Sequence, residues 1–143
     1  MMNESERDLQ ASGSAIVLIA EDEEPIAEAL AYIVEDSGYV PLLASNGRQA
    51  LELARAFHPA LVITDLMMPQ MTGAQLVAAL RAEADRSGEK APAIVIMSAA
   101  GPKYTDHLGA DAVLSKPFDL SDVEALLAAH LGDSAADDSV RVR

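Results

Sequence analysis

Five side chains that can bind a cation or a phosphoryl group stand within two residues after short apolar runs of the sequence. They are Glu21, Asp22, Asp65, Ser98 and Lys116. Mg²⁺ takes oxygen ligands, and one or two carboxylates with phosphate oxygens and water are enough to hold it. An aspartate can act as a nucleophile and form an aspartyl-phosphate, while a hydroxyl and an ammonium can bond to phosphoryl oxygens. The residue types therefore predict a magnesium and phosphoryl site, provided that the fold brings them together.

Each of these residues taken alone also has a simpler interpretation. An acidic residue after a strand often caps the next helix. Ser98, which precedes two alanines and a glycine, could be a turn residue, and Lys116 could be a solvated charge. The adjacent Met67 and Met68 are interpreted as packing residues of a loop. Only convergence of the five side chains favours the functional interpretation.

Short apolar runs bounded by polar, Gly or Pro residues predict five buried strands. The runs cover residues 15–20, 40–44, 60–64, 93–97 and 112–114. Between them, apolar residues recur at helical spacing. The predicted helices begin near Pro25, near Asn46 with Gln49, at Thr72 with Gln75, and at Asp119 or Ser121, and the first and last end near Gly38 and Gly132.

This alternation of strands and helices predicts a doubly wound α/β fold, with a parallel sheet and helices on both faces. In such sheets the ligand lies at the carboxyl ends of the strands. The five polar side chains follow those ends, so we expect them to meet on one rim.

Composition limits the class of protein further. The 143 residues are enough for one ordinary domain, and no apolar run approaches the roughly 20 residues of a membrane span. The polar, acidic start lacks the pattern of a secretory signal, and the absence of cysteine suits a reducing cytosol. A net charge of −13 disfavours nucleic acid and anionic membranes as partners. We therefore expect a cytoplasmic protein with no membrane contact and no direct contact with nucleic acid.

Four stretches carry a resemblance to a known family. "VLIAEDEEPI", "LVITDLMMPQMTG", "AIVIMSA" and "AVLSKPF" resemble, in this order, the signature stretches of the receiver domain of two-component response regulators. The resemblance implies a flavodoxin-like sheet of strand order 2-1-3-4-5 and a receiver domain over 15–132. Residues 1–14 are expected to be a flexible extension, and 133–143 a flexible polar tail. No output domain is recognised after the receiver, so we expect a stand-alone or an excised receiver.

The resemblance also implies roles for the acidic residues. Asp65 matches the aspartate that accepts a phosphoryl group from a sensor histidine kinase or a histidine phosphotransfer protein. Asp22 matches a direct Mg²⁺ ligand, and Glu21 a residue that acts on the metal through water. The backbone carbonyl of Met67 matches the third protein ligand of the metal.

Two further residues match the phosphoryl-binding part of the family's site. Ser98 matches the hydroxyl residue that moves towards the phosphoryl group, and Lys116 matches the lysine that pairs with it. The bond between Lys116 and Pro117 is commonly cis in the family, so a cis bond is expected here. The resemblance does not imply an enzyme with a separate substrate, but a module that accepts a phosphoryl group and could catalyse its own phosphorylation and dephosphorylation.

The sequence departs from the family pattern at three places. Glu21 replaces the commoner aspartate, and Val113 stands where the family often has a Tyr or Phe that reports phosphorylation. From Ser98 to Lys116 there are 18 positions, about one helical turn (~4 residues) fewer than in a typical receiver. The fourth helix is therefore predicted to be short or irregular. Tyr104 in the same segment could replace the missing aromatic residue.

Three functions remain open from the sequence. The first is a phosphorylation-controlled module in which a change at the fourth helix, the fifth strand and the last helix alters the binding of an unknown downstream protein. The second is a phosphorylation-independent scaffold or degenerate receiver that acts by protein contact alone. The third, a phosphatase or phosphotransferase for small molecules, lacks a visible second general acid or substrate pocket.

Overall fold

The computed structural model describes residues 15–100 and 108–132 of the chain. Five strands and four helices occupy these residues. Their bounds are β1 Ile16–Ala20, α2 Glu24–Asp36, β2 Val40–Ala44, α3 Gly47–Phe57, β3 Leu61–Asp65, α4 Gly73–Ser87, β4 Ala93–Ser98, β5 Ala112–Ser115 and α5 Leu120–His130. The predicted strands are confirmed, with bounds that differ by no more than one residue.

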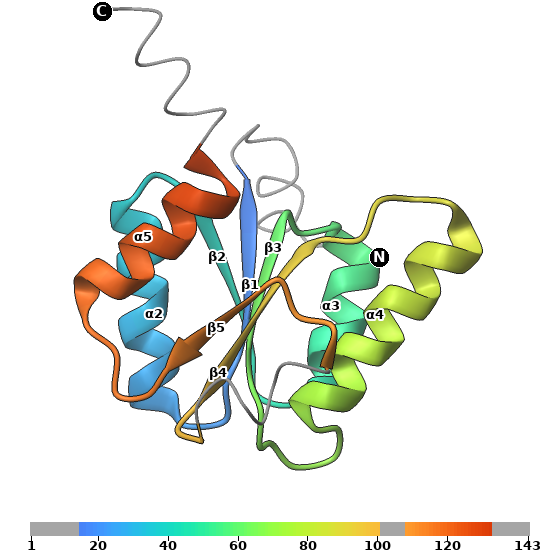
Figure 1. Ribbon diagram of the computed structural model, residues 1–143, viewed down its shortest axis with the longest axis horizontal. Helices are drawn as coiled ribbons and strands as arrows, with labels where there is room; N and C mark the ends of the chain where they lie inside the picture. Colours follow the sequence, from blue (N-terminus) through green and yellow to red (C-terminus); the bar gives the residue numbers. More distant parts are fainter. Residues whose placement is uncertain (1–14, 101–107, 133–143) are drawn as a thin grey trace, which may run out of the picture.

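All strand pairs are parallel, and the sheet has the order β2-β1-β3-β4-β5. Helices α2 and α5 cover one face of the sheet, and α3 and α4 cover the other (Figure 1). The predicted flavodoxin-like, doubly wound fold is therefore confirmed. Because every strand runs in the same direction, the loops that follow the strands emerge at one end of the molecule.

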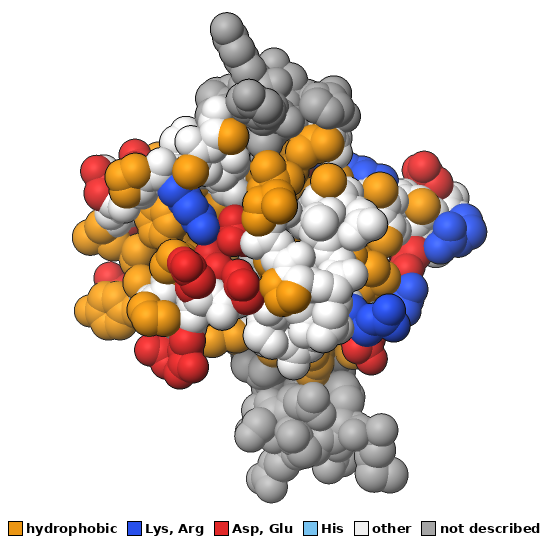
Figure 2. Space-filling model, turned by 90° about the horizontal axis from the view of Figure 1, so that it is seen from below, with side chains coloured by type: hydrophobic (Ala, Val, Ile, Leu, Met, Phe, Trp, Pro, Cys, Tyr) orange, Lys and Arg blue, Asp and Glu red, His pale blue; other side chains and the backbone are white. Residues whose placement is uncertain are grey.

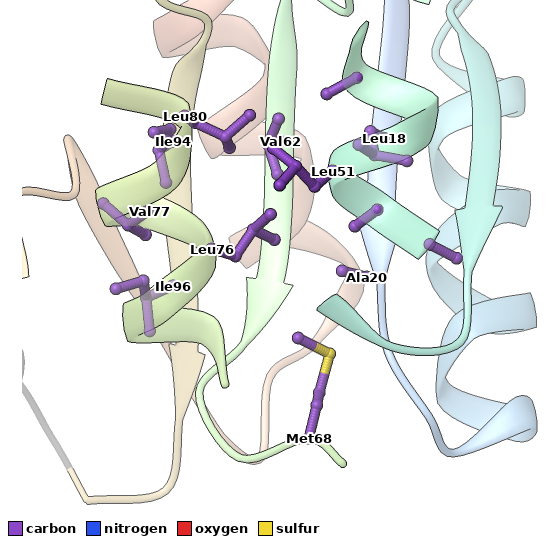
Figure 3. Packing of buried hydrophobic residues seen from close by; sticks show 13 residues of the cluster. Leu18, Ala20, Leu51, Val62, Met68, Leu76, Val77, Leu80, Ile94 and Ile96 are labelled. Carbon is purple, nitrogen blue, oxygen red and sulfur yellow. The ribbon is translucent and has the colours of Figure 1, made fainter. Parts of the chain in front are cut away.

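The strands hold two cores, since their side chains point alternately to the two faces. One core lies between the sheet and α2 with α5, and it includes Val17, Ile19, Leu30, Ile63 and Leu127. The other lies beneath α3 and α4 (Figure 3), and it includes Leu18, Leu51, Val62, Leu76, Leu80, Ile94 and Ile96. We call α3, α4 and this second core the α3/α4 layer. Two buried faces explain why the strands are continuous apolar runs rather than alternating ones.

The predicted helix caps are also observed. The Asn46 side chain accepts a hydrogen bond from the Gln49 N–H at 2.8 Å, and Thr72 forms a capping box with Gln75. At α5 the cap is Asp119, whose carboxylate accepts the Asp122 N–H at 3.0 Å. Side-chain caps of this kind satisfy N–H groups that a helix leaves unpaired at its start.

Some expectations fall outside the described residues. These are the two termini, residues 1–14 and 133–143, and most of the segment predicted to hold the fourth helix, 101–107, with Tyr104 in it. Val113 is described, and it lies half-buried in β5 beside Ile96 of β4. The Lys116–Pro117 bond is cis, as expected. In the described ranges, no helix combines the length and the apolar character needed to cross a membrane.

Candidate functional site

The five candidate side chains meet at the end of the molecule where the strands finish. Glu21 and Asp22 follow β1, Asp65 closes β3, Ser98 closes β4, and Lys116 follows β5. We call these five residues the acceptor rim. Figure 2 looks onto this end, where acidic side chains gather around a basic one. The convergence on which the functional interpretation depended is therefore present.

Three carboxylates of the rim lie close enough to share one cation. A ligand oxygen from each of Glu21, Asp22 and Asp65 lies within 4.8 Å of the other two. Glu21 is buried, Asp65 is half-buried and Asp22 is exposed. The group therefore has one side fixed in the protein and one side open to solvent.

Lys116 links two of these carboxylates. Its Nζ lies 3.2 Å from Glu21 Oε1 and 3.3 Å from Asp65 Oδ1. The other Glu21 oxygen, Oε2, accepts a hydrogen bond of 3.0 Å from the Glu23 backbone N–H. Both oxygens of the buried Glu21 are thus held by protein donors, while Asp65 has only one of its oxygens in the pair with Lys116.

Burial and charge shift the pKa values of this pair. Burial raises the pKa of Glu21 above its usual value, and the Asp65 carboxylate adds to the rise, whereas the Glu23 N–H and Lys116 oppose it. Burial lowers the pKa of Lys116, but Asp65 and Glu21 outweigh this effect and leave that pKa above its usual value. Lys116 therefore carries its positive charge at neutral pH, next to the candidate acceptor.

A pocket of about 490 Å³ opens beside Asp65, and its lining includes Asp22, Met67, Ser98 and Lys116. Ser98 is buried, and its Oγ accepts a 3.0 Å hydrogen bond from the Ala100 N–H. The packing interpretation of the two methionines is wrong for Met67, whose side chain is 71% exposed, and right for Met68, which is buried in the α3/α4 layer (Figure 3). Met67 therefore lines the pocket, but its exposed side chain does not anchor the loop.

The loop from β3 to α4 is anchored by Gly73 and by Thr64, of which Thr64 was not among the predicted site residues. Gly73 lies so close to the end of β3 that a Cβ there would overlap the Asp65 carbonyl oxygen and lie 2.9 Å from Leu66 Cα. The buried Thr64 hydroxyl donates to the same Asp65 carbonyl at 2.9 Å. A polar residue at the end of the apolar run 60–64 was the one available signal for Thr64.

The comparisons with known proteins agree with this geometry. The family model of the response regulator receiver domain matches residues 17–128. The chain belongs to this family of two-component signalling modules, in which phosphorylation control is general. The resemblance inferred from the four sequence stretches is therefore confirmed.

Individual relatives give the same result. Response regulator Rre1 of Synechocystis is 34% identical over 113 residues, which are 78% of this chain and 49% of that protein. The polar-differentiation response regulator DivK of Brucella ovis is 28% identical over 121 residues, 82% of this chain and 97% of DivK. The chain thus spans about half of Rre1 and nearly all of DivK.

Among solved structures, the chemotaxis protein CheY4 of Vibrio cholerae superposes with a TM-score of 0.73 and 28% sequence identity. The match covers 83% of this chain and 100% of the CheY4 chain. The fold of this protein is therefore that of a receiver domain.

Proposed function

We propose that the protein is a phosphorylation-controlled signalling module in which Asp65 accepts a phosphoryl group from a histidine of a sensor kinase or a phosphotransfer protein. The observation that carries the proposal is the position of Asp65. It has a lysine ammonium 3.3 Å away, two further carboxylates within 4.8 Å, and an open pocket beside it.

The rim fits a bound Mg²⁺. Oxygen ligands around this ion lie 2.0–2.1 Å from it, so ligands on opposite sides of the ion are about 4.2 Å apart. One oxygen from each of the three carboxylates lies within 4.8 Å of the other two, which is a similar span. Asp22, Asp65 and the Met67 carbonyl would hold the ion, with Glu21 behind them. A bound Mg²⁺ would neutralise negative charge on the transferring phosphoryl group.

In the proposed step, an Asp65 carboxylate oxygen attacks phosphorus and forms the new O–P bond. The bond from phosphorus to the donor imidazole nitrogen breaks, and that nitrogen leaves with the electron pair. Lys116 pairs with a phosphoryl oxygen, and Ser98 donates its hydroxyl hydrogen to another. Because these groups belong to the receiver itself, the protein would also react with small phosphodonors, and water attacking the same phosphorus would reverse the modification.

The signal would leave through a protein partner. Phosphorylation would draw Ser98 and Lys116 towards the new group, and the face that includes β5 and α5 would change its affinity for a downstream protein. The net charge of −13 supports a protein partner rather than nucleic acid. A cytoplasmic location belongs to the same proposal.

The proposal is tested by incubating the protein with acetyl phosphate, with and without Mg²⁺, and measuring its intact mass. We expect a single phosphoryl adduct that requires Mg²⁺ and is lost in Asp65→Asn. Asp85→Asn, which changes an exposed carboxylate of α4 in the same way, should form the adduct as the wild type does. No adduct with acetyl phosphate or with a histidine kinase would favour the scaffold function instead.

A further inference from the structure

Thr64 is unusual among the buried side chains of the protein. In the described ranges, the buried polar side chains are those of Glu21, Thr64 and Ser98. All three lie at the carboxyl ends of β1, β3 and β4. Two belong to the acceptor rim, and Thr64 precedes the third rim position, Asp65. A buried hydroxyl is thus placed next to the acceptor and nowhere else along β3.

An apolar residue at position 64 would fill the same space without burying a hydroxyl. Thr64 is fully buried, between Ala20 of β1 and Ile96 of β4. Valine has nearly the same shape, suits a strand equally well, and carries no hydroxyl to be desolvated. The hydroxyl is compensated by its 2.9 Å hydrogen bond to the Asp65 carbonyl oxygen. The specific property of threonine at this position is therefore its bond to the backbone of the acceptor.

That bond holds one side of the peptide unit between Asp65 and Leu66. On the other side, the Leu66 N–H donates to the Met97 carbonyl at 3.1 Å. Gly73 packs against the same unit, and its N–H donates to the Leu66 carbonyl at 2.9 Å. The first peptide of the loop that leads to Met67 is consequently fixed at its carbonyl, at its N–H and on its face.

We infer that Thr64 is a positioning residue for cation binding: its hydroxyl fixes the Asp65–Leu66 peptide, and with it the direction in which the chain carries the Met67 carbonyl towards the carboxylates. The inference rests on the proposed function, since it concerns the Mg²⁺ that would support phosphorylation of Asp65. In this role Thr64 would act through the backbone and would contact neither the cation nor the phosphoryl group.

The test compares Thr64→Val, which removes the hydroxyl and keeps the shape, with Thr64→Ser, which keeps the hydroxyl. Mg²⁺ alone is titrated into each protein by calorimetry. We expect Thr64→Val to bind Mg²⁺ about 3- to 10-fold more weakly, the factor that corresponds to one neutral hydrogen bond, and Thr64→Ser to bind it nearly as tightly as the wild type. At saturating Mg²⁺, the rate of adduct formation from acetyl phosphate should return close to the wild-type rate.

Ile96→Val is the matched control. Ile96 is a fully buried neighbour of Thr64 in the sheet, so this variant reduces packing at the same place without touching the hydroxyl. It should lower the melting temperature and leave Mg²⁺ affinity unchanged. Thr64→Ala gives a second protein without the hydroxyl, and it should show the same loss of affinity as Thr64→Val.

Unchanged Mg²⁺ affinity in Thr64→Val, or an equal loss in Ile96→Val, would overturn the inference and leave the proposed function intact, provided that the wild type forms its adduct. If the wild type binds Mg²⁺ but forms no adduct with any donor, the proposed function fails while the affinity comparison still decides the role of Thr64. A wild type that neither binds Mg²⁺ nor forms an adduct would overturn both.

Discussion

Charges are arranged in opposite ways at the acceptor rim and on the α3/α4 layer. At the rim, three carboxylates lie close together and Lys116 pairs with two of them, Glu21 and Asp65, and burial raises the pKa of the innermost, Glu21. On the layer, opposite charges are paired across elements, Arg55 with Glu83 and Arg81 with Asp111. The layer thus pairs its charges one to one, whereas the rim gathers three carboxylates with a single lysine and buries Glu21.

The same difference extends to the ends of the elements. Helices α3 and α4 begin with side-chain caps at Asn46 and Thr72, and each ends at a left-handed residue, His58 or Gly88. At the rim, α2 follows Glu23, whose side chain makes no capping bond. Clustered carboxylates and a helix start without a side-chain cap lower the stability of the folded protein. A bound cation and a phosphoryl group would interact favourably with these features. The comparison indicates that the layer stabilises the fold and the rim carries the function.

The largest expected effect is on the layer. Leu76→Ala removes a fully buried side chain of its core, and this should lower the free energy of unfolding by about 2–5 kcal/mol. Urea denaturation measures the loss. If the layer serves only stability, the folded fraction should still form the adduct at Asp65. Loss of adduct formation in protein that remains folded would contradict the division into two regions.

The next largest effect is expected where the two regions meet. Gly73→Ala places a Cβ against the Asp65 carbonyl and the Leu66 backbone, so overpacking should cost about 1–3 kcal/mol and slow adduct formation by displacing the loop. Gly88→Ala, at the other end of α4, meets no atom within 4 Å but has a φ of +77°. It should cost about 1–2 kcal/mol and leave the adduct rate unchanged. Equal adduct rates in the two variants would show that the loop position does not matter.

The smallest change in stability is expected at the rim, where the substitution should stabilise the protein rather than destabilise it. Because the pKa of Glu21 is raised in the folded state, the stability gained from its protonated form is present below the usual value of 4.5 and is lost as pH rises through the folded pKa. In the absence of metal, Glu21→Gln should therefore gain stability relative to the wild type as pH rises from 4.5 to neutral.

Urea denaturation at several pH values measures this difference. Glu28→Gln, an exposed position on α2, is the control for removing a carboxylate at the surface. A Glu21→Gln protein that becomes less stable than the wild type with rising pH would show that the pair with Lys116 outweighs the cost of burial. The rim would then not be the less stable of the two regions.

Both the fold and the residues that form the acceptor rim could be predicted from the sequence. Continuous apolar runs such as 93–97 predicted strands with two buried faces, and residue types such as Asn46 and Thr72 marked helix starts through short-range hydrogen bonds. The parallel arrangement then required Glu21, Asp65 and Lys116 to meet, although Lys116 lies 95 positions after Glu21.

The sequence was not sufficient for contacts that depend on the detailed path of a loop. Met67 and Met68 are chemically identical neighbours, yet one is exposed and the other is buried, because the turn after β3 points them in different directions. The bond from Thr64 to the Asp65 carbonyl and the approach of Gly73 are likewise set by backbone geometry. Hydrophobic pattern does not encode such distances.

Direct location of the phosphoryl group tests whether Asp65 is the residue phosphorylated. After incubation with acetyl phosphate and Mg²⁺, reduction with borohydride converts an aspartyl-phosphate into homoserine, and peptide mass spectrometry then locates the converted residue. We expect conversion at Asp65 alone, in a reaction that needs Mg²⁺ and is weakened in Lys116→Ala. Conversion at Asp22 or another carboxylate, or none in a protein that has bound Mg²⁺, would contradict it.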